Sequence, residues 1–74
     1  MEFQVKLNSM EDAAKLVNRL EHYEYRAEAV VGSLVLNAKS IMGLLGFGIG
    51  RRIRLIIHTG IDEGLKAALN EFMI

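Results

Sequence analysis

The chain has 74 residues, no cysteine and a formal net charge of zero, which points to one small domain and excludes both a disulfide framework and a thiolate metal site. The balanced charge also excludes an overall field that would draw the chain to nucleic acid or anionic lipid, so any such attraction has to be local. Its longest apolar run, residues 41–49, is shorter than the roughly 20 residues of a membrane-spanning helix. Residues 1–12 lack the apolar core of a secretory signal. We therefore expect one globular, cytoplasmic domain over residues 1–74.

Residues 2–21 predict a strand followed by an amphipathic helix. In EFQVKL, apolar and polar side chains alternate, which is the period of a strand with one buried face. Apolar residues then recur at helical spacing, so we expect a helix over about Met10–Glu21. Ser9 is followed three residues later by Asp12, as in a capping box, in which the serine oxygen accepts an amide proton and the acidic side chain reaches back.

Residues 25–74 predict three more strands and two more helices. Residues 25–37 form a predicted hairpin that turns at Gly32 and Ser33. KSIMGLLG, residues 39–46, predicts a helix kept short by its glycines. The alternation in RIRLIIH, residues 52–58, predicts the last strand. Asp62 then caps a final helix, whose apolar stripe is Leu65, Ala68, Leu69 and Phe72.

This order of elements indicates an α+β fold. We expect an open-faced β-sandwich, in which a four-stranded, mostly antiparallel sheet carries three helices on one face. Pattern alone does not fix the strand order, so a ferredoxin-like split arrangement remains the alternative. The sequence contains no linker, second domain or internal repeat.

The central run NAKSIMGLLGFG, with Lys39, Ser40, Ile41, Met42 and Gly43 together, resembles the regulatory-serine segment of HPr. These are the histidine-containing phosphocarrier proteins of the bacterial sugar phosphotransferase system. The order of elements also resembles HPr over nearly the whole chain, and the resemblance implies the HPr-like open-faced sandwich. In that family a histidine at the start of the first helix, in a Gly-x-His-Ala-Arg-Pro type motif, takes phosphate from Enzyme I and passes it to sugar-specific proteins.

The resemblance also implies where this histidine would lie. Alignment without gaps from the serine motif places Ser9 at the histidine position and Glu11 at the arginine position. Phosphate relay through histidine needs an imidazole nucleophile and cationic or helix-terminal donors around the phosphoryl oxygens. A serine ester is far more stable, and Glu11 would repel an incoming phosphate. We therefore expect no catalytic residue and no enzyme activity, similar to the catabolite-repression HPr paralogues that lack the histidine and keep the serine.

Ser40 matches the serine that a bifunctional kinase/phosphorylase phosphorylates in Gram-positive HPr proteins, where the product is a corepressor for a catabolite-control transcription factor. The structural alternative is that Ser40 is only a helix N-cap. The resemblance also implies a surface on the first two helices that binds these protein partners. Its expected residues are Met10, Ala14, Asn18, Ile41, Met42 and Leu45.

For apolar residues in a small domain, core packing is the default explanation. We expect core packing for Leu44 and Phe47. For the other apolar residues of the second helix, Ile41, Met42 and Leu45, a place in the core and a place in an exposed docking patch are equally compatible with the sequence. The outward residues of the first helix include Glu11 and Glu21. This acidic character departs from the basic character of the family and changes which partners fit.

Two patterns after the serine run have simple structural explanations. GFGIG, residues 46–50, differs from nucleotide-binding glycine motifs in spacing and in position, so these glycines end the short helix and turn the chain. Arg51, Arg52 and Arg54 form a small basic patch that would suit a phosphate or an acidic partner. A solvated strand edge is the simpler explanation.

The two histidines, His22 and His58, are expected to be ordinary surface or strand-end residues. Neither has a paired carboxylate or a second ligand at metal spacing in the sequence, so we expect no metal and no cofactor. The strands lack the aromatic residues with which RNA-binding sheets stack bases. We therefore expect no direct nucleic-acid binding and no membrane association.

The leading hypothesis is a non-enzymatic HPr-like protein that acts through protein contacts and is switched at Ser40. The alternative is a phosphocarrier of the sugar phosphotransferase system that uses a non-standard phosphoacceptor. A third hypothesis is a small ligand-binding or interaction domain of ferredoxin-like fold.

Overall fold

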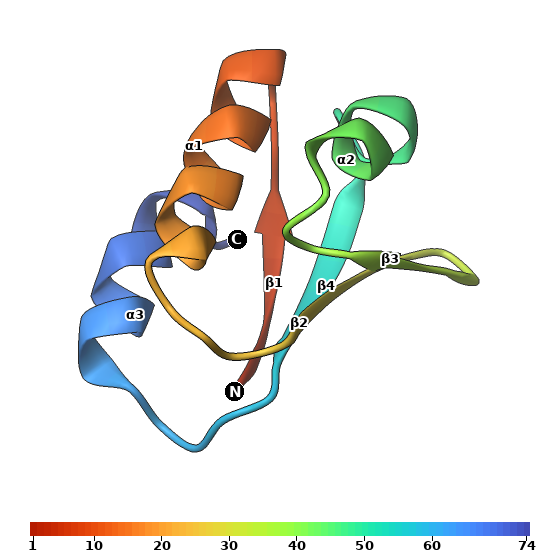
Figure 1. Ribbon diagram of the computed structural model, residues 1–74. Coiled ribbons are helices and arrows are strands. Elements are labelled where there is room, and N and C mark those ends of the chain that lie inside the picture. The colour runs from red at the N-terminus through yellow and green to blue at the C-terminus, as the bar shows by residue number, and fades with distance from the viewer.

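The computed structural model describes residues 1–74 and has a four-stranded antiparallel sheet with its helices on one face (Figure 1). The strands are β1 (Glu2–Lys6), β2 (Ala27–Val31), β3 (Leu34–Asn37) and β4 (Arg52–Ile57). The helices are α1 (Met10–Glu21), α2 (Ile41–Phe47) and α3 (Glu63–Leu69), the last extended by a 3₁₀ turn, η1 (Asn70–Phe72). The strand order is β1-β4-β2-β3, and every neighbouring pair is antiparallel. These findings confirm the predicted α+β open-faced sandwich.

The core lies between the helices and one face of the sheet. Its 17 clustered residues are all hydrophobic, and no polar or charged residue is buried. Because side chains alternate across a strand, every second residue of β4 enters the core, as the alternation in RIRLIIH predicted. These residues are Ile53, Leu55 and Ile57. The longest helix, α1, has 12 residues, and no helix is both long and apolar enough to cross a membrane.

The first helix begins and ends at the predicted residues, Met10 and Glu21. The Asp12 N–H donates to Ser9 Oγ at 3.1 Å, so Ser9 caps α1 as expected. Asp12 Oδ2 in turn accepts a bond from the Asn8 N–H at 3.0 Å. The reciprocal capping pair is therefore present, but the carboxylate reaches one residue further back than in the standard capping box.

Two expectations were wrong. Phe47 is 53% exposed and does not belong to the core. Leu44 is the one fully buried residue of the seven-residue α2, and the side chain of its last residue, Phe47, is exposed. Arg52 and Arg54 do not lie on an edge strand, because β4 is central between β1 and β2. Their exposed side chains project from the open face of the sheet instead.

Two glycines near the end of α2 provide a test of this local structure. Gly46 lies inside the helix, and a Cβ added there would meet open space. Gly50 has φ +76°, and its N–H donates to the Leu7 carbonyl at 2.7 Å. We expect Gly46→Ala to raise the free energy of unfolding by about 0.5–1 kcal/mol, and Gly50→Ala to lower it by about 1–2 kcal/mol because of its left-handed backbone. Urea denaturation of both variants measures these changes. If both substitutions changed the free energy of unfolding in the same direction, the helical conformation of Gly46 or the left-handed conformation of Gly50 would be wrong.

Candidate functional site

The surface predicted to bind partners is formed by α1 and α2, which contact each other above the sheet (Figure 1). We call its six residues the α1–α2 surface: Met10, Ala14, Asn18, Ile41, Met42 and Leu45. Met10 is 68% exposed and Met42 76%, so neither side chain contributes much to the core. Ile41 and Leu45 are partly buried and pack against it. In α2, therefore, Met42 fits the explanation as an exposed patch, whereas Ile41 and Leu45 fit the explanation as core packing.

The environment of Ser9 is acidic. Ser9 is exposed and caps α1, and the first turn of that helix carries Glu11 and Asp12. Glu11 forms an ion pair with Lys15 at 3.4 Å. The positive end of the helix dipole, which would otherwise attract a substrate anion, thus has two carboxylates of the chain itself beside it.

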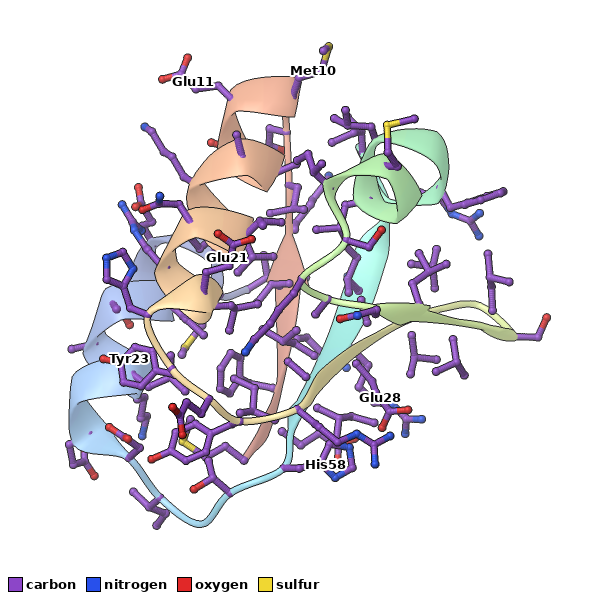
Figure 2. The ribbon with its side chains drawn as sticks, in the orientation of Figure 1. Met10, Glu11, Glu21, Tyr23, Glu28 and His58 are labelled. Carbon is purple, nitrogen blue, oxygen red and sulfur yellow. The ribbon has the colours of Figure 1, made fainter.

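No histidine lies near the start of α1. His22 caps the other end of this 12-residue helix, roughly 18 Å away at 1.5 Å per residue, and its Nδ1 lies 2.8 Å from the Asn18 carbonyl oxygen. Figure 2 shows Met10 and Glu11 at one end of the molecule and His58 at the other. Neither imidazole is therefore placed to replace a phosphoacceptor at the position of Ser9.

One expectation about the histidines was wrong. His58 has a paired carboxylate, since its Nε2 lies 2.6 Å from Glu28 Oε1 (Figure 2). The sequence could not indicate this pair, because the two residues are separated by 30 positions and meet through the pairing of β2 with β4. Both side chains are partly exposed. The chain has no group of three side chains arranged to hold a metal ion.

Ser40 is the N-cap of α2. The Gly43 N–H donates to Ser40 Oγ at 3.4 Å, and the Ser40 N–H donates to the Asn37 carbonyl at 2.9 Å. The residue before it, Lys39, extends toward the end of α1, where its Nζ donates to the Tyr23 carbonyl at 2.6 Å. The capping bond is weak and the hydroxyl is only partly buried, so capping does not prevent access to Ser40 Oγ.

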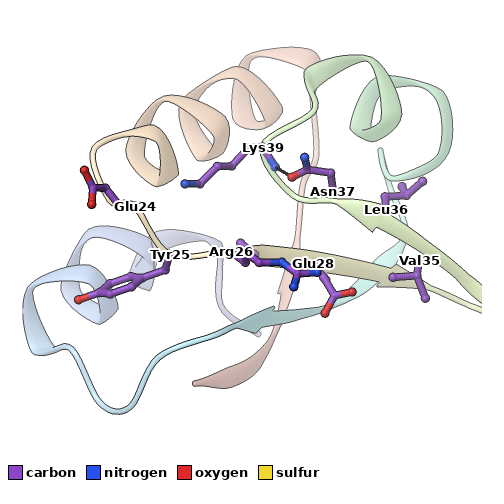
Figure 3. Close-up of a pocket in the computed structure, with 9 residues that line it drawn as sticks. Glu24, Tyr25, Arg26, Glu28, Val35, Leu36, Asn37 and Lys39 are labelled. Carbon is purple, nitrogen blue, oxygen red and sulfur yellow. Dashed lines mark hydrogen bonds between the residues drawn. The ribbon is translucent and has the colours of Figure 1, made fainter.

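An open pocket of about 360 Å³, which no sequence pattern indicated, lies between the start of β2 and the end of β3 (Figure 3). Its charged lining side chains come from Glu24, Arg26, Glu28 and Lys39. Cations and carboxylates thus face the same space. The lining therefore offers contacts for both anionic and cationic groups of a ligand.

Tyr25, which also lines this pocket, links it to α3. The Tyr25 hydroxyl donates to Asp62 Oδ2 at 2.8 Å, and Asp62 Oδ1 accepts from the Leu65 N–H at 3.0 Å as the N-cap of α3. The Leu65 amide, followed by the Tyr25 hydroxyl, holds the pKa of Asp62 below its ordinary value. The bond to Asp62 raises the pKa of Tyr25. The tyrosine ring also stacks on Tyr23, with centroids 6.0 Å apart.

Comparison with known proteins identifies the fold. No family model matches the chain, and no curated protein matches it significantly. Solved structures do match. A phosphocarrier protein HPr from Bacillus anthracis has a TM-score of 0.72 and 21% identity, over 100% of this chain and 96% of that chain. The chain has the HPr fold.

Two further structures agree with this assignment. HPr-C-His from Thermoanaerobacter tengcongensis has a TM-score of 0.70 and 22% identity, over 96% of this chain and 85% of that chain. The histidine-containing phosphocarrier protein of a mycoplasma has a TM-score of 0.73 and 14% identity, over 96% and 89%. At such identities the likeness is one of fold, and it favours the HPr arrangement over the ferredoxin-like alternative.

The pair of Tyr25 and Asp62 predicts a dependence of stability on pH. A carboxyl group whose pKa is lowered on folding stabilises the native state above its unfolded pKa, near 3.8, and this stabilisation is lost as the pH falls through the folded pKa. Tyr25→Phe removes one cause of the lowered pKa. We expect the variant to be less stable than wild type at pH 7, and the difference to shrink below about pH 4.

Chemical denaturation at a series of pH values measures this difference. Tyr23→Phe is the matched control, because the hydroxyl of Tyr23 forms no hydrogen bond. A stability loss in Tyr25→Phe that stays constant down to pH 2 would show that the pair with Asp62 is not its cause.

Proposed function

We propose that this chain is an HPr-like protein that works in the cytoplasm through protein contacts, without catalysis or phosphate relay, and that phosphorylation of Ser40 regulates it in carbon catabolite control. The observation that carries the proposal is the side chain at the start of α1. Ser9 stands there as a helix cap, beside Glu11 and Asp12. A hydroxyl in an acidic setting is unsuited to the rapid, reversible phosphate transfer for which an imidazole is used.

The contact surface supports the binding half of the proposal. Met10 and Met42 expose large, flexible apolar side chains on neighbouring helices, and methionine adapts to the shapes of different partners. Exposed Glu11 follows Met10 in the first turn of α1, and exposed Glu21 lies at the other end of the same helix. An apolar centre with acidic neighbours suits a partner that presents an apolar side chain within a basic surface.

The position of Ser40 supports the regulatory half. Ser40 immediately precedes Ile41 and Met42, so a phosphate on its hydroxyl would place about two negative charges beside the α1–α2 surface. Such a change in charge would weaken the binding of some partners and strengthen the binding of others. The proposed partners are an HPr kinase/phosphorylase, which would modify Ser40, and a transcription regulator that would read the modification.

Phosphorylation assays separate this proposal from the phosphocarrier alternative. Incubation with Enzyme I and phosphoenolpyruvate is expected to leave the protein unmodified, whereas HPr kinase and ATP are expected to add one phosphate to Ser40. Intact mass and peptide mapping detect both reactions, with Ser40→Ala and Ser9→Ala as matched controls. Acid-labile phosphate on His22, on His58 or elsewhere would contradict the proposal, and a chain that stays unmodified by the kinase would retain only a constitutive binding role.

A substitution at Met42 tests the apolar contacts of the α1–α2 surface. Met42→Ala is expected to lower kcat/KM for phosphorylation by HPr kinase about tenfold, since removing a central contact residue costs about 1–2 kcal/mol of binding. Its stability is expected to change little because the side chain is exposed. Ile61→Ala is the matched control, because Ile61 is 82% exposed and lies between β4 and α3, outside the surface. Equal rates for the two variants would rule out a contact at Met42.

A further inference from the structure

The face of the sheet that the helices leave uncovered carries a basic patch, formed by Lys6, Arg52 and Arg54. In the pairing of β1 with β4, Lys6 lies directly opposite Arg52, and Gln4 lies opposite Arg54. All four side chains are exposed. Because directly opposite side chains have Cβ atoms only about 5 Å apart, two like charges at such positions destabilise the sheet.

The chain does not neutralise this patch. The open face has two carboxylates, and each is already engaged: Glu2 pairs with Arg54 at 3.3 Å, and Glu28 pairs with His58 at 2.6 Å. Arg52 donates only to the neutral amide oxygen of Gln4, at 3.2 Å. Lys6 and Arg52 therefore remain as two adjacent cations with no ion pair.

An apolar area adjoins the basic patch on the same face. It consists of three side chains: Val35, 58% exposed, and the partly buried Val30 and Ile56. Val30 lies opposite both Val35 and Arg54, and Ile56 follows Arg54 by two residues on the same face of β4. Apolar area beside unneutralised charge is the composition of a protein-binding surface. Single-stranded nucleic acid would instead need aromatic side chains for stacking, and the strand residues of this face include none.

We propose that the open face of the sheet binds an acidic protein segment. Carboxylates of the partner pair with Lys6 and Arg52, and an apolar side chain of the partner packs against Val30, Val35 and Ile56. This surface lies on the opposite side of the sheet from the α1–α2 surface and does not depend on the function proposed for that surface.

The test uses a ten-residue peptide of eight glutamates and two leucines as the probe, titrated into the ¹⁵N-labelled full chain. The amide resonances that shift are expected to lie in the four strands of the sheet, around Lys6, Val30, Val35 and Arg52. Lys6→Glu is expected to raise Kd at least fivefold, because it replaces a cation of the patch with an anion. Its melting temperature is expected to equal or exceed that of wild type, since the new residue forms an opposite-charge pair across from Arg52. Loss of binding then cannot be loss of fold.

Lys66→Glu is the matched control. It makes the same change of charge on an exposed residue of α3, which belongs to the helical side of the sheet and lies outside the basic patch, and is expected to leave Kd within twofold of wild type. The proposal is overturned if Lys66→Glu weakens binding as much as Lys6→Glu does, or if the shifted amides lie in α1 and α2. Tighter binding of a ten-nucleotide oligothymidylate at the same residues would also overturn it, because the patch would then recognise nucleic acid.

Discussion

The alternation of side chains along β4 is the constraint on which the rest of the structure depends. This strand is central, with β1 on one side and β2 on the other. Ile53, Leu55 and Ile57 point into the core beneath the helices, while Arg52 and Arg54 point out of the open face. Because the period is two, a slip of one residue would bury the arginines and expose the isoleucines. The same six-residue strand thus determines both the hydrophobic cluster and the charged surface opposite it.

At the start of α1, structural needs account for Ser9, Glu11 and Asp12. Ser9 Oγ accepts a bond from an amide that the helix cannot satisfy internally, and Glu11 and Asp12 complement the helix dipole. A site that receives phosphate works in the opposite way, since it leaves donors and positive potential free for the ligand. The local electrostatics therefore favour stability of the helix over anion capture, which supports the proposal of protein contacts in place of phosphate transfer at this end of the molecule.

Elements with strong local signals were predictable from the sequence, and pairings between distant residues were not. The bounds of α1 and the alternation of β4 follow from periods and a cap that lie within a few residues of one another. The strand order depends on contacts between segments far apart in the chain, so the sequence could not place Arg52 and Arg54 on a central strand. The same limitation concealed the bond between Tyr25 and Asp62, across 37 positions, and the pocket at the start of β2. Phe47 was misplaced for another reason: it is the last residue of α2, and its side chain is exposed although an apolar residue in a small domain is more often buried.

A net charge of zero conceals an uneven distribution of charge in this protein. Acidic side chains of α1 lie beside exposed methionines on the helical side, whereas unpaired cations lie beside valines and an isoleucine on the open side of the sheet. Electrostatic attraction between proteins acts over about 8–10 Å at physiological salt, so each partner responds to the surface it approaches and not to the total charge. The sheet separates the two surfaces, and a partner on one does not cover the other. The two proposals together therefore describe a small domain with one surface suited to a basic partner and another suited to an acidic partner.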